Sequence, residues 1–280
     1  MKKIGVIGFG TMGAGIAQVC VEAGYEVIAI EKEKAYFDRG LKQIQKNWNR
    51  AIEKGRLNEE TQTKYEKLLV TSTEWESIAD ADFVIEAVSE DMELKKDIFR
   101  KIDQSVNEKA IIVSNTSGLS ITEIASVMKD PGRVMGFHFF NPVPVMKLVE
   151  LIRGYDTTDE TYEKSLALVE SLGKEAVAVK ESPLFAVNRI LVPMINEAIF
   201  VLQEGVATAE DIDKGMKLGA NHPIGPLALA DLIGLDTLLF VQDSLYEETQ
   251  DSKYRAASLL RKLVRAGHLG RKTGKGFFEY

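Results

Sequence analysis

A glycine-rich stretch near the start of the chain constrains the fold more than any other feature of the sequence. Residues 3–7 (KIGVI) are a short apolar run typical of a buried strand, and a GxGxxG pattern that opens a helix follows it directly. Its first glycine permits a tight turn, its second lets backbone amides approach a pyrophosphate, and its third lets the helix pack closely on the sheet. Because those amides and the helix dipole favour a diphosphate, the stretch predicts a dinucleotide site. The expected contacts are Gly8, Gly10, Thr11, Met12 and Gly13.

The expected cofactor follows from Glu31, which ends a second apolar strand eighteen residues after Gly13. A carboxylate at this place can accept hydrogen bonds from both ribose hydroxyls, and it would repel a 2′-phosphate. NAD is therefore favoured over NADP. Lys32 and Lys34 lie close by and weaken that preference, so NADP stays open as the second choice.

Composition narrows the class of protein. The chain has 280 residues and a formal net charge of −7, which argues against general binding to nucleic acids or to a membrane surface. Cys20 is the only cysteine, so neither a disulfide framework nor a CxxC metal site is expected, and its apolar neighbours predict a packing role. Because no segment has the length and hydrophobicity of a membrane span, we expect a cytoplasmic protein. No bound metal is expected either.

The order of predicted strands and helices indicates two domains. Strand runs alternate with helical periodicity as far as residue 182, as in a doubly wound, mainly parallel α/β sheet of the Rossmann type. From residue 183 to 280 only helical periodicity remains, and its long apolar stripes favour a homodimer formed through this helical domain. Its first helix is expected over residues 184–203. Strands are expected at residues 3–7, 27–30, 83–86, 110–114, 136–140, 148–152 and 175–179.

A helical hairpin is expected as an insertion in the first domain, over residues 35–54 and 59–68. An apolar stripe and a separate basic stripe run along its first helix. In an acidic chain, a basic stripe indicates either a site for a polyanionic ligand or a solvated helix face, and the spacing alone leaves both open. The apolar stripe is Phe37, Leu41, Ile44, Trp48 and Ile52, and the basic stripe is Arg39, Lys42, Lys46, Arg50 and Lys54.

His138 is the strongest candidate for acid–base chemistry. It lies near the end of a predicted strand, at the edge where ligands bind in this fold class. A dehydrogenase needs a proton acceptor beside the hydride acceptor, and imidazole titrates in the useful range. Glu150 stands in an otherwise apolar strand, where a carboxylate is costly unless it is paired, so a His138–Glu150 pair is expected. A core histidine bonded to a backbone carbonyl is the alternative.

Polar residues at two other places are candidates for the same site. Asn115, Thr116 and Ser117 follow a strand and offer an amide and hydroxyls where a nicotinamide and a substrate would meet, although a plain turn is the alternative. Asn188 begins the helical domain, where the two domains are expected to face each other. For Asn188 the alternative is an ordinary residue on a helix surface.

Taken together, these motifs resemble the 3-hydroxyacyl-CoA dehydrogenase family, and most closely its bacterial single-function members that act on 3-hydroxybutyryl-CoA. The resemblance covers the whole chain, from GFGTMGAGIA at the start to GRKTGKGFFEY at the end. The blocks SNTS at residues 114–117 and HFFNPVPVMKLVE at residues 138–150 are the most specific when found together.

The resemblance implies reversible hydride transfer between NAD and C3 of a short 3-hydroxyacyl-CoA. His138 would take the 3-hydroxyl proton, Glu150 would orient and stabilise the imidazole, and Ser117 and Asn188 would bind the substrate oxygens. Cofactor contacts would fall at Glu90, Lys95, Asn141 and Lys272, beside Asn115, and coenzyme A contacts at Arg50 and Lys54 of the basic stripe.

Two residues depart from the family's pattern. Glu31 replaces the more usual aspartate, and Gly118 replaces the usual second serine after Ser117, so one polar group near the substrate is missing. A dehydrogenase of a free 3-hydroxy acid and a non-catalytic NAD-binding protein stay open as alternatives. The basic stripe argues against the first, because a substrate without coenzyme A does not need it, and the strand-embedded Glu150 argues against the second.

Overall fold

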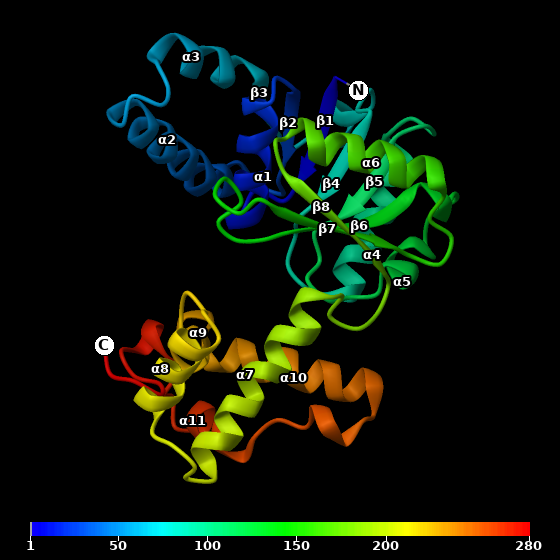
Figure 1. Cartoon of the computed structure of the whole chain (residues 1–280). Coiled ribbons are helices and arrows are strands. Elements are labelled where there is room, and N and C mark those ends of the chain that lie inside the picture. Colours follow the sequence, from blue (N-terminus) through cyan, green and yellow to red (C-terminus); the bar gives the residue numbers. More distant parts are fainter. Residues whose placement is uncertain (1) are drawn as a thin grey trace. The chain divides into compact units, whose positions relative to one another are not determined.

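The computed structural model of the chain describes residues 2–280 (Figure 1). The chain folds into two compact units, the first ending at Ser182 and the second beginning at Pro183. Within the described residues, the first unit holds all eight strands of one sheet, and the second is helical apart from isolated bridges near its end. No helix in residues 2–280 is both long enough and apolar enough to cross a membrane.

The sheet of the first unit has the strand order β3-β2-β1-β4-β5-β6-β7-β8. All neighbouring strands run parallel except β6 and β7, which are antiparallel. From β1 the chain passes to β2 on one side and later resumes at β4 on the other, and a ligand crevice forms at such a reversal of strand order. The strands are β1 Lys3–Ile7, β2 Glu26–Ile30, β3 Leu69–Ser72, β4 Phe83–Glu86, β5 Ile111–Ser114, β6 Val134–Phe139, β7 Leu148–Arg153 and β8 Glu175–Lys180.

Helices cover both faces of this sheet. Side chains of α1, α2 and α6 join strand residues such as Phe83 and Phe137 in one apolar cluster on the first face. Figure 1 shows α4 and α5 on the side of the sheet opposite α6. The helices are α1 Thr11–Glu22, α2 Phe37–Glu53, α3 Glu59–Leu68, α4 Met92–Ser105, α5 Ile121–Ala125 and α6 Asp159–Ser171. Four of them begin after a side chain that accepts a hydrogen bond from a first-turn amide, namely Asn58, Asp91, Ser120 and Thr158.

The hairpin of α2 and α3 is inserted between β2 and β3. Trp48 fastens it to α1, because its indole N–H donates to Glu22 Oε1 at 2.8 Å. The predicted apolar stripe is wrong at Leu41, whose side chain is 38% exposed. At this level the helix turns Gly40 inward instead, and Phe9 lies so close that a Cβ on Gly40 would be 2.5 Å from its ring.

The second unit is built from five α-helices around a core that includes Ile195, Leu227 and Leu238. The expectation of a helix over residues 184–203 is wrong at its start. Leu184 and Phe185 have positive φ angles of 60° and 58°, which a right-handed helix cannot contain, and the helix begins after them. The helices are α7 Val187–Gln203, α8 Ala209–Gly219, α9 Pro226–Ile233, α10 Leu235–Thr249 and α11 Ser258–Arg265.

The fold class expected from the sequence is confirmed: a doubly wound, mainly parallel sheet with an inserted helical hairpin is followed by a helical unit. Two elements were not expected, namely β3 and α5, and neither was the antiparallel direction of β7 relative to β6. Cys20 packs in the core as predicted. Burial raises the pKa of its thiol to about 12, so the thiol stays protonated at neutral pH.

Candidate active site

Four loops meet at one edge of the sheet, because β1, β4, β5 and β6 are parallel neighbours and their carboxyl ends coincide. Backbone hydrogen bonds join the first three loops: the amide of Ala87 donates to the carbonyl of Ile7, and that of Asn115 to Glu86, each at 2.8 Å. The side chain of Asn115 accepts from the amide of Phe139 at 3.0 Å. Asn115 therefore connects the loop after β5 to β6, which a plain turn would not do.

The glycine-rich turn after β1 has the geometry that a diphosphate requires. Gly8 has a φ of 89°, and a Cβ there would lie 2.8 Å from the carbonyl oxygen of Ala87. A Cβ on Gly13 would lie 1.8 Å from the carbonyl oxygen of Gly8, so only glycine permits this close packing of α1. In front of Gly10 no atom of the described chain lies within 4 Å of such a Cβ, and no side chain caps α1. The first-turn amides of α1 are thus placed to bind an anion.

Glu31 lies beside this turn. Its Oε1 accepts the backbone N–H of Phe9 at 2.6 Å, and its Oε2 accepts that of Lys32 at 3.2 Å. The carboxylate is therefore held next to the glycines, at the position where a ribose is bound in this fold class.

His138 and Glu150 form a buried pair across the antiparallel strands β6 and β7. They are direct register partners, which places both side chains on one face of the sheet. Nδ1 of His138 lies 2.8 Å from Oε2 of Glu150, and the two residues are 5% and 0% exposed. The ring of Phe140 lies 4.5 Å from the imidazole, centroid to centroid. When Nδ1–H donates to the carboxylate, the basic lone pair is on Nε2, so the pair can exchange a proton there.

Glu90 joins the loop after β4 to the loop after β5. Its Oε1 accepts from the hydroxyl of Thr116 at 2.6 Å, from the amide of Ser117 at 2.8 Å and from the hydroxyl of Ser117 at 3.1 Å. Ser117 is therefore fixed through both its backbone and its side chain.

A buried charged group beneath these loops was missed by the sequence analysis. Glu86, the last residue of β4, is 0% exposed, and its Oε1 lies 2.7 Å from Nζ of Lys95. Lys95, expected as a cofactor contact, is 1% exposed and also lies 3.5 Å from Oε2 of Glu90. The signal that identified Glu150, a carboxylate in an apolar strand, was equally present in the run Phe83–Glu86.

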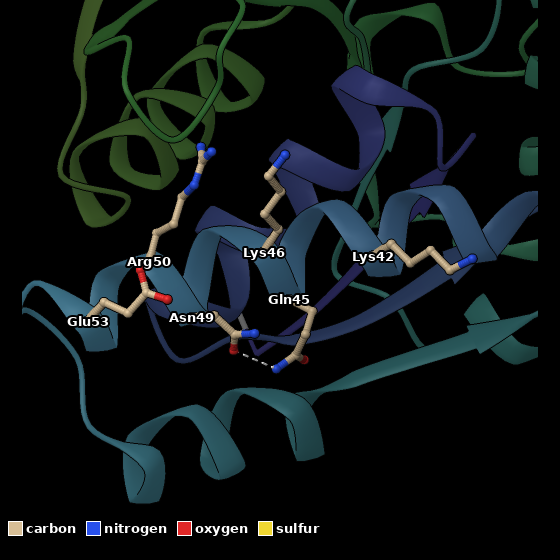
Figure 2. A pocket seen from close by; sticks show the side chains of 6 residues that line it. All are labelled: Lys42, Gln45, Lys46, Asn49, Arg50 and Glu53. Atoms are coloured by element: carbon tan, nitrogen blue, oxygen red, sulfur yellow. Dashed lines mark hydrogen bonds between the residues drawn. The ribbon is translucent and has the colours of Figure 1, made fainter.

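Three residues of the basic stripe, Lys42, Lys46 and Arg50, line a groove along the exposed surface of α2 (Figure 2). Lys46 and Arg50 extend from one side of the helix, whereas Gln45 and Asn49 extend from the other and are joined by a hydrogen bond of 3.1 Å. Arg39 and Lys54 are exposed but do not line the groove. Its lining residues are Lys42, Gln45, Lys46, Asn49, Arg50 and Glu53.

The remaining predicted residues are placed as follows. Asn141 is exposed and precedes a cis proline. Asn188 is the second residue of α7, and Lys272 pairs through Nζ with both carboxylate oxygens of Asp236 at 2.6 and 2.7 Å, within the second unit. Residues 2–280 contain no group of three or more His, Cys, Asp or Glu residues able to hold a metal ion. The structure thus gathers His138 and Glu150 in one pair, and Glu90, Lys95 and Ser117 in a second group.

Comparison with known proteins gives matches over both units. Residues 3–182 match the family model described as 3-hydroxyacyl-CoA dehydrogenase, NAD binding domain, and residues 185–280 match the model of that family's C-terminal domain. The chain is 49% identical over 278 residues to 3-hydroxybutyryl-CoA dehydrogenase of Clostridioides difficile, covering 99% of each chain. It is 39% identical over 287 residues to the human mitochondrial hydroxyacyl-coenzyme A dehydrogenase, covering 100% of this chain and 91% of the relative. The crystal structure of (S)-3-hydroxybutyryl-CoA dehydrogenase from Ralstonia eutropha matches with a TM-score of 0.98 at 50% identity, covering 100% of this chain and 99% of that one.

Proposed function

We propose, from the premise that the chain belongs to the 3-hydroxyacyl-CoA dehydrogenase family, that it interconverts 3-hydroxybutyryl-CoA and acetoacetyl-CoA with NAD as cofactor. The substrate is proposed because the bacterial relative from Clostridioides difficile and the Ralstonia eutropha structure both carry this substrate in their names. The observation that carries the proposal is the buried His138–Glu150 pair: a fully buried carboxylate is costly unless it is paired, and its partner here is an imidazole that can exchange a proton at Nε2.

NAD supplies the hydride acceptor of the oxidation. The turn of Gly8, Gly10 and Gly13 would bind its diphosphate through backbone amides, with Thr11 and Met12 beside it at the start of α1. Glu31 would bind the ribose and repel a 2′-phosphate, so NAD is preferred over NADP. Further cofactor contacts are proposed at Glu90, Lys95, Asn115, Asn141 and Lys272.

His138 would act as general base in the oxidation and as general acid in the reverse direction. Nε2 takes the proton of the 3-hydroxyl group, and the imidazole becomes positively charged as it does so. Glu150 stabilises that charge at short range in a site with little water, where electrostatic interactions are strong. Ser117 and Asn188 would hydrogen-bond the substrate oxygens and hold the reacting carbon in place.

The basic groove on α2 would bind the phosphates of coenzyme A. Lys42, Lys46 and Arg50 stand one helical turn apart and carry charges of one sign in a chain whose net charge is negative. Lys54 continues the row at the end of the helix, so Arg50 and Lys54 are both proposed as contacts. A free 3-hydroxy acid has no phosphates for these residues to bind.

A homodimer formed through the second unit is part of the proposal. Large apolar side chains of that unit are exposed to solvent, among them Ile190, Leu218 and Phe240. Light scattering of the purified protein is expected to give about twice the mass of one chain. A cytoplasmic location is also proposed, because NAD and acyl-CoA are available there, and cell fractionation tests it.

Steady-state kinetics tests the proposed function. With NADH, acetoacetyl-CoA is expected to be reduced with a kcat/KM at least about 100-fold above that for acetoacetate, because only the thioester carries the coenzyme A contacts. NADPH should support a lower kcat/KM than NADH. Equal values for acetoacetate would favour the free-acid alternative, and NADH binding without turnover of either substrate would favour a non-catalytic protein.

A further inference from the structure

We propose that Glu86 is a positioning residue for the reaction: acting through Lys95 and Glu90, its buried carboxylate fixes the hydroxyl group of Ser117. The inference rests on the proposed function, in which Ser117 binds a substrate oxygen.

Glu86 holds three segments together from a position without access to solvent. Its Oε1 accepts from the amide of Val88 at 2.6 Å and from Nζ of Lys95 at 2.7 Å, and its Oε2 accepts from the hydroxyl of Ser114 at 2.6 Å. These donors belong to the loop after β4, to α4 and to the end of β5. One carboxylate therefore fixes where the loops after β4 and β5 begin.

Lys95 connects Glu86 to Glu90, which contacts the loop after β5 that carries Ser117. Its ammonium group also donates to the carbonyl of Val88 at 3.3 Å and lies 3.5 Å from Oε2 of Glu90. The other oxygen of Glu90 accepts from Thr116 and, at 2.8 and 3.1 Å, from the amide and hydroxyl of Ser117. Carboxylate, ammonium, carboxylate and hydroxyl thus alternate in one connected row from Glu86 to Ser117.

The charge balance of this row explains why Glu86 matters for Ser117. Lys95 lies closer to Glu86 than to Glu90, so Glu86 satisfies most of its charge and Glu90 stays directed at Ser117. Without the negative charge of Glu86, a buried ammonium group would be left with one carboxylate within reach. Glu90 would then move toward Lys95, and its hydrogen bonds to Ser117 would lengthen and weaken.

Stability alone does not account for such a group. A buried ion pair contributes little net stability compared with well-packed apolar residues, because the desolvation of both charges offsets their attraction. The pair does fix geometry, since each charged hydrogen bond has a defined length and direction. Here the geometry that the pair fixes determines the position of the loop that carries Ser117.

A double-mutant cycle between Glu86 and Ser117 tests the inference, with kcat/KM for acetoacetyl-CoA measured at saturating NADH. Ser117→Ala is expected to lower this value by about tenfold, which corresponds to the loss of one good hydrogen bond to the substrate. Glu86→Gln keeps the shape of the side chain, and we expect a loss of about tenfold. The double variant should fall no more than about twofold below Ser117→Ala, because both changes remove one contribution.

Asp103→Asn is the matched control. It also leaves a buried arginine, Arg133, without its carboxylate in the same unit, but that pair has no contact with Glu86 or Ser117. Its effect on the thermal midpoint should resemble that of Glu86→Gln, while its effect on kcat/KM should be small and should multiply with that of Ser117→Ala. Where Glu86→Gln fails to fold, Ser114→Ala replaces it, since this variant removes one donor to Glu86 and should give a smaller loss with the same lack of additivity.

The outcomes separate the inference from the function on which it rests. Full multiplication of the Glu86→Gln and Ser117→Ala effects, or a wild-type kcat/KM in both Glu86→Gln and Ser114→Ala, would overturn the role of Glu86. If the parent protein does not turn over acetoacetyl-CoA, or if Ser117→Ala changes nothing, the proposed function or its substrate site fails first.

Discussion

The His138–Glu150 pair and the basic groove on α2 are built in opposite ways. The pair is made by two strands whose register places the side chains opposite each other, and it is almost wholly buried. The groove is made by one helix, its basic side chains stand in solvent, and their only fixed relation is the helical repeat (Figure 2).

This difference in burial suits the two regions to different tasks, proton transfer and substrate binding. A buried pair interacts strongly because little water screens it, so it suits a proton transfer that must occur at one atom. Exposed charges interact weakly with any one group, and salt reduces their effect, so they suit the capture of a phosphate-bearing substrate. The first region should therefore control kcat and the second KM.

The largest effect is expected at His138. His138→Gln should lower kcat by about two to four decades, the usual contribution of general acid–base catalysis. The dissociation constant of NADH, measured by fluorescence titration, should change little because the imidazole acts on the substrate oxygen. A variant with near wild-type turnover would remove His138 from the mechanism.

Replacing Glu150, the partner of His138, should lower kcat by a factor comparable to or smaller than that of His138→Gln. Glu150→Gln keeps a hydrogen-bond acceptor for Nδ1 but removes the charge that stabilises the imidazolium ion. We expect kcat to fall by about one to three decades, and the variant combined with His138→Gln to be no slower than His138→Gln alone. Independent effects in stopped-flow reduction of acetoacetyl-CoA would show that the two residues do not act as one unit.

Substitutions in the groove should raise KM and leave kcat nearly unchanged. Lys46→Ala combined with Arg50→Ala is expected to raise KM for acetoacetyl-CoA by about tenfold, because a remote contact contributes equally to the ground and transition states. Arg39→Ala is the matched control: Arg39 is an exposed basic residue of the same helix, lies outside the groove lining and is not proposed as a contact, so this variant should leave KM nearly unchanged. An unchanged KM in all these variants would identify the stripe as a solvated helix face.

The smallest effect is the salt dependence of that contact. KM of the parent enzyme should climb severalfold between low ionic strength and 0.3 M salt, since exposed charges are screened over about 8 Å at physiological ionic strength. The Lys46 and Arg50 double variant should show a flatter dependence, and kcat should stay constant in both. A salt response of equal slope in parent and variant would place the coenzyme A phosphates elsewhere.

Local patterns in the sequence were sufficient to predict most of the fold. The glycine turn, the alternation of strands with helices and the hairpin each depend on neighbouring residues, and the blocks around Ser117 and His138 identified the family correctly. The expected His138–Glu150 pair is present as well, because a carboxylate in an apolar strand requires a partner.

What the sequence did not predict depends on distant parts of the chain. The antiparallel direction of β7 is set by how a loop returns, and the periodicity of residues 148–152 is the same in either direction. Leu41 fits the apolar stripe and is nevertheless exposed, because Phe9 approaches the helix at Gly40. The apolar run before Glu86 did indicate a buried carboxylate, but its pairing with Lys95 depends on how α4 lies against the end of β4, which the sequence does not show.

The pairing of His138 and Glu150 also destabilises a misaligned register of β6 and β7 while the sheet forms. Successive residues of a strand face opposite sides, so a slip of β7 by one residue would turn Glu150 toward the apolar cluster that contains Phe137 of β6. An unpaired carboxylate there would destabilise the sheet by about 3–5 kcal/mol, the usual cost of breaking a buried ion pair. A misaligned chain would therefore lose stability and activity together, and folded but inactive copies should not accumulate from this fault.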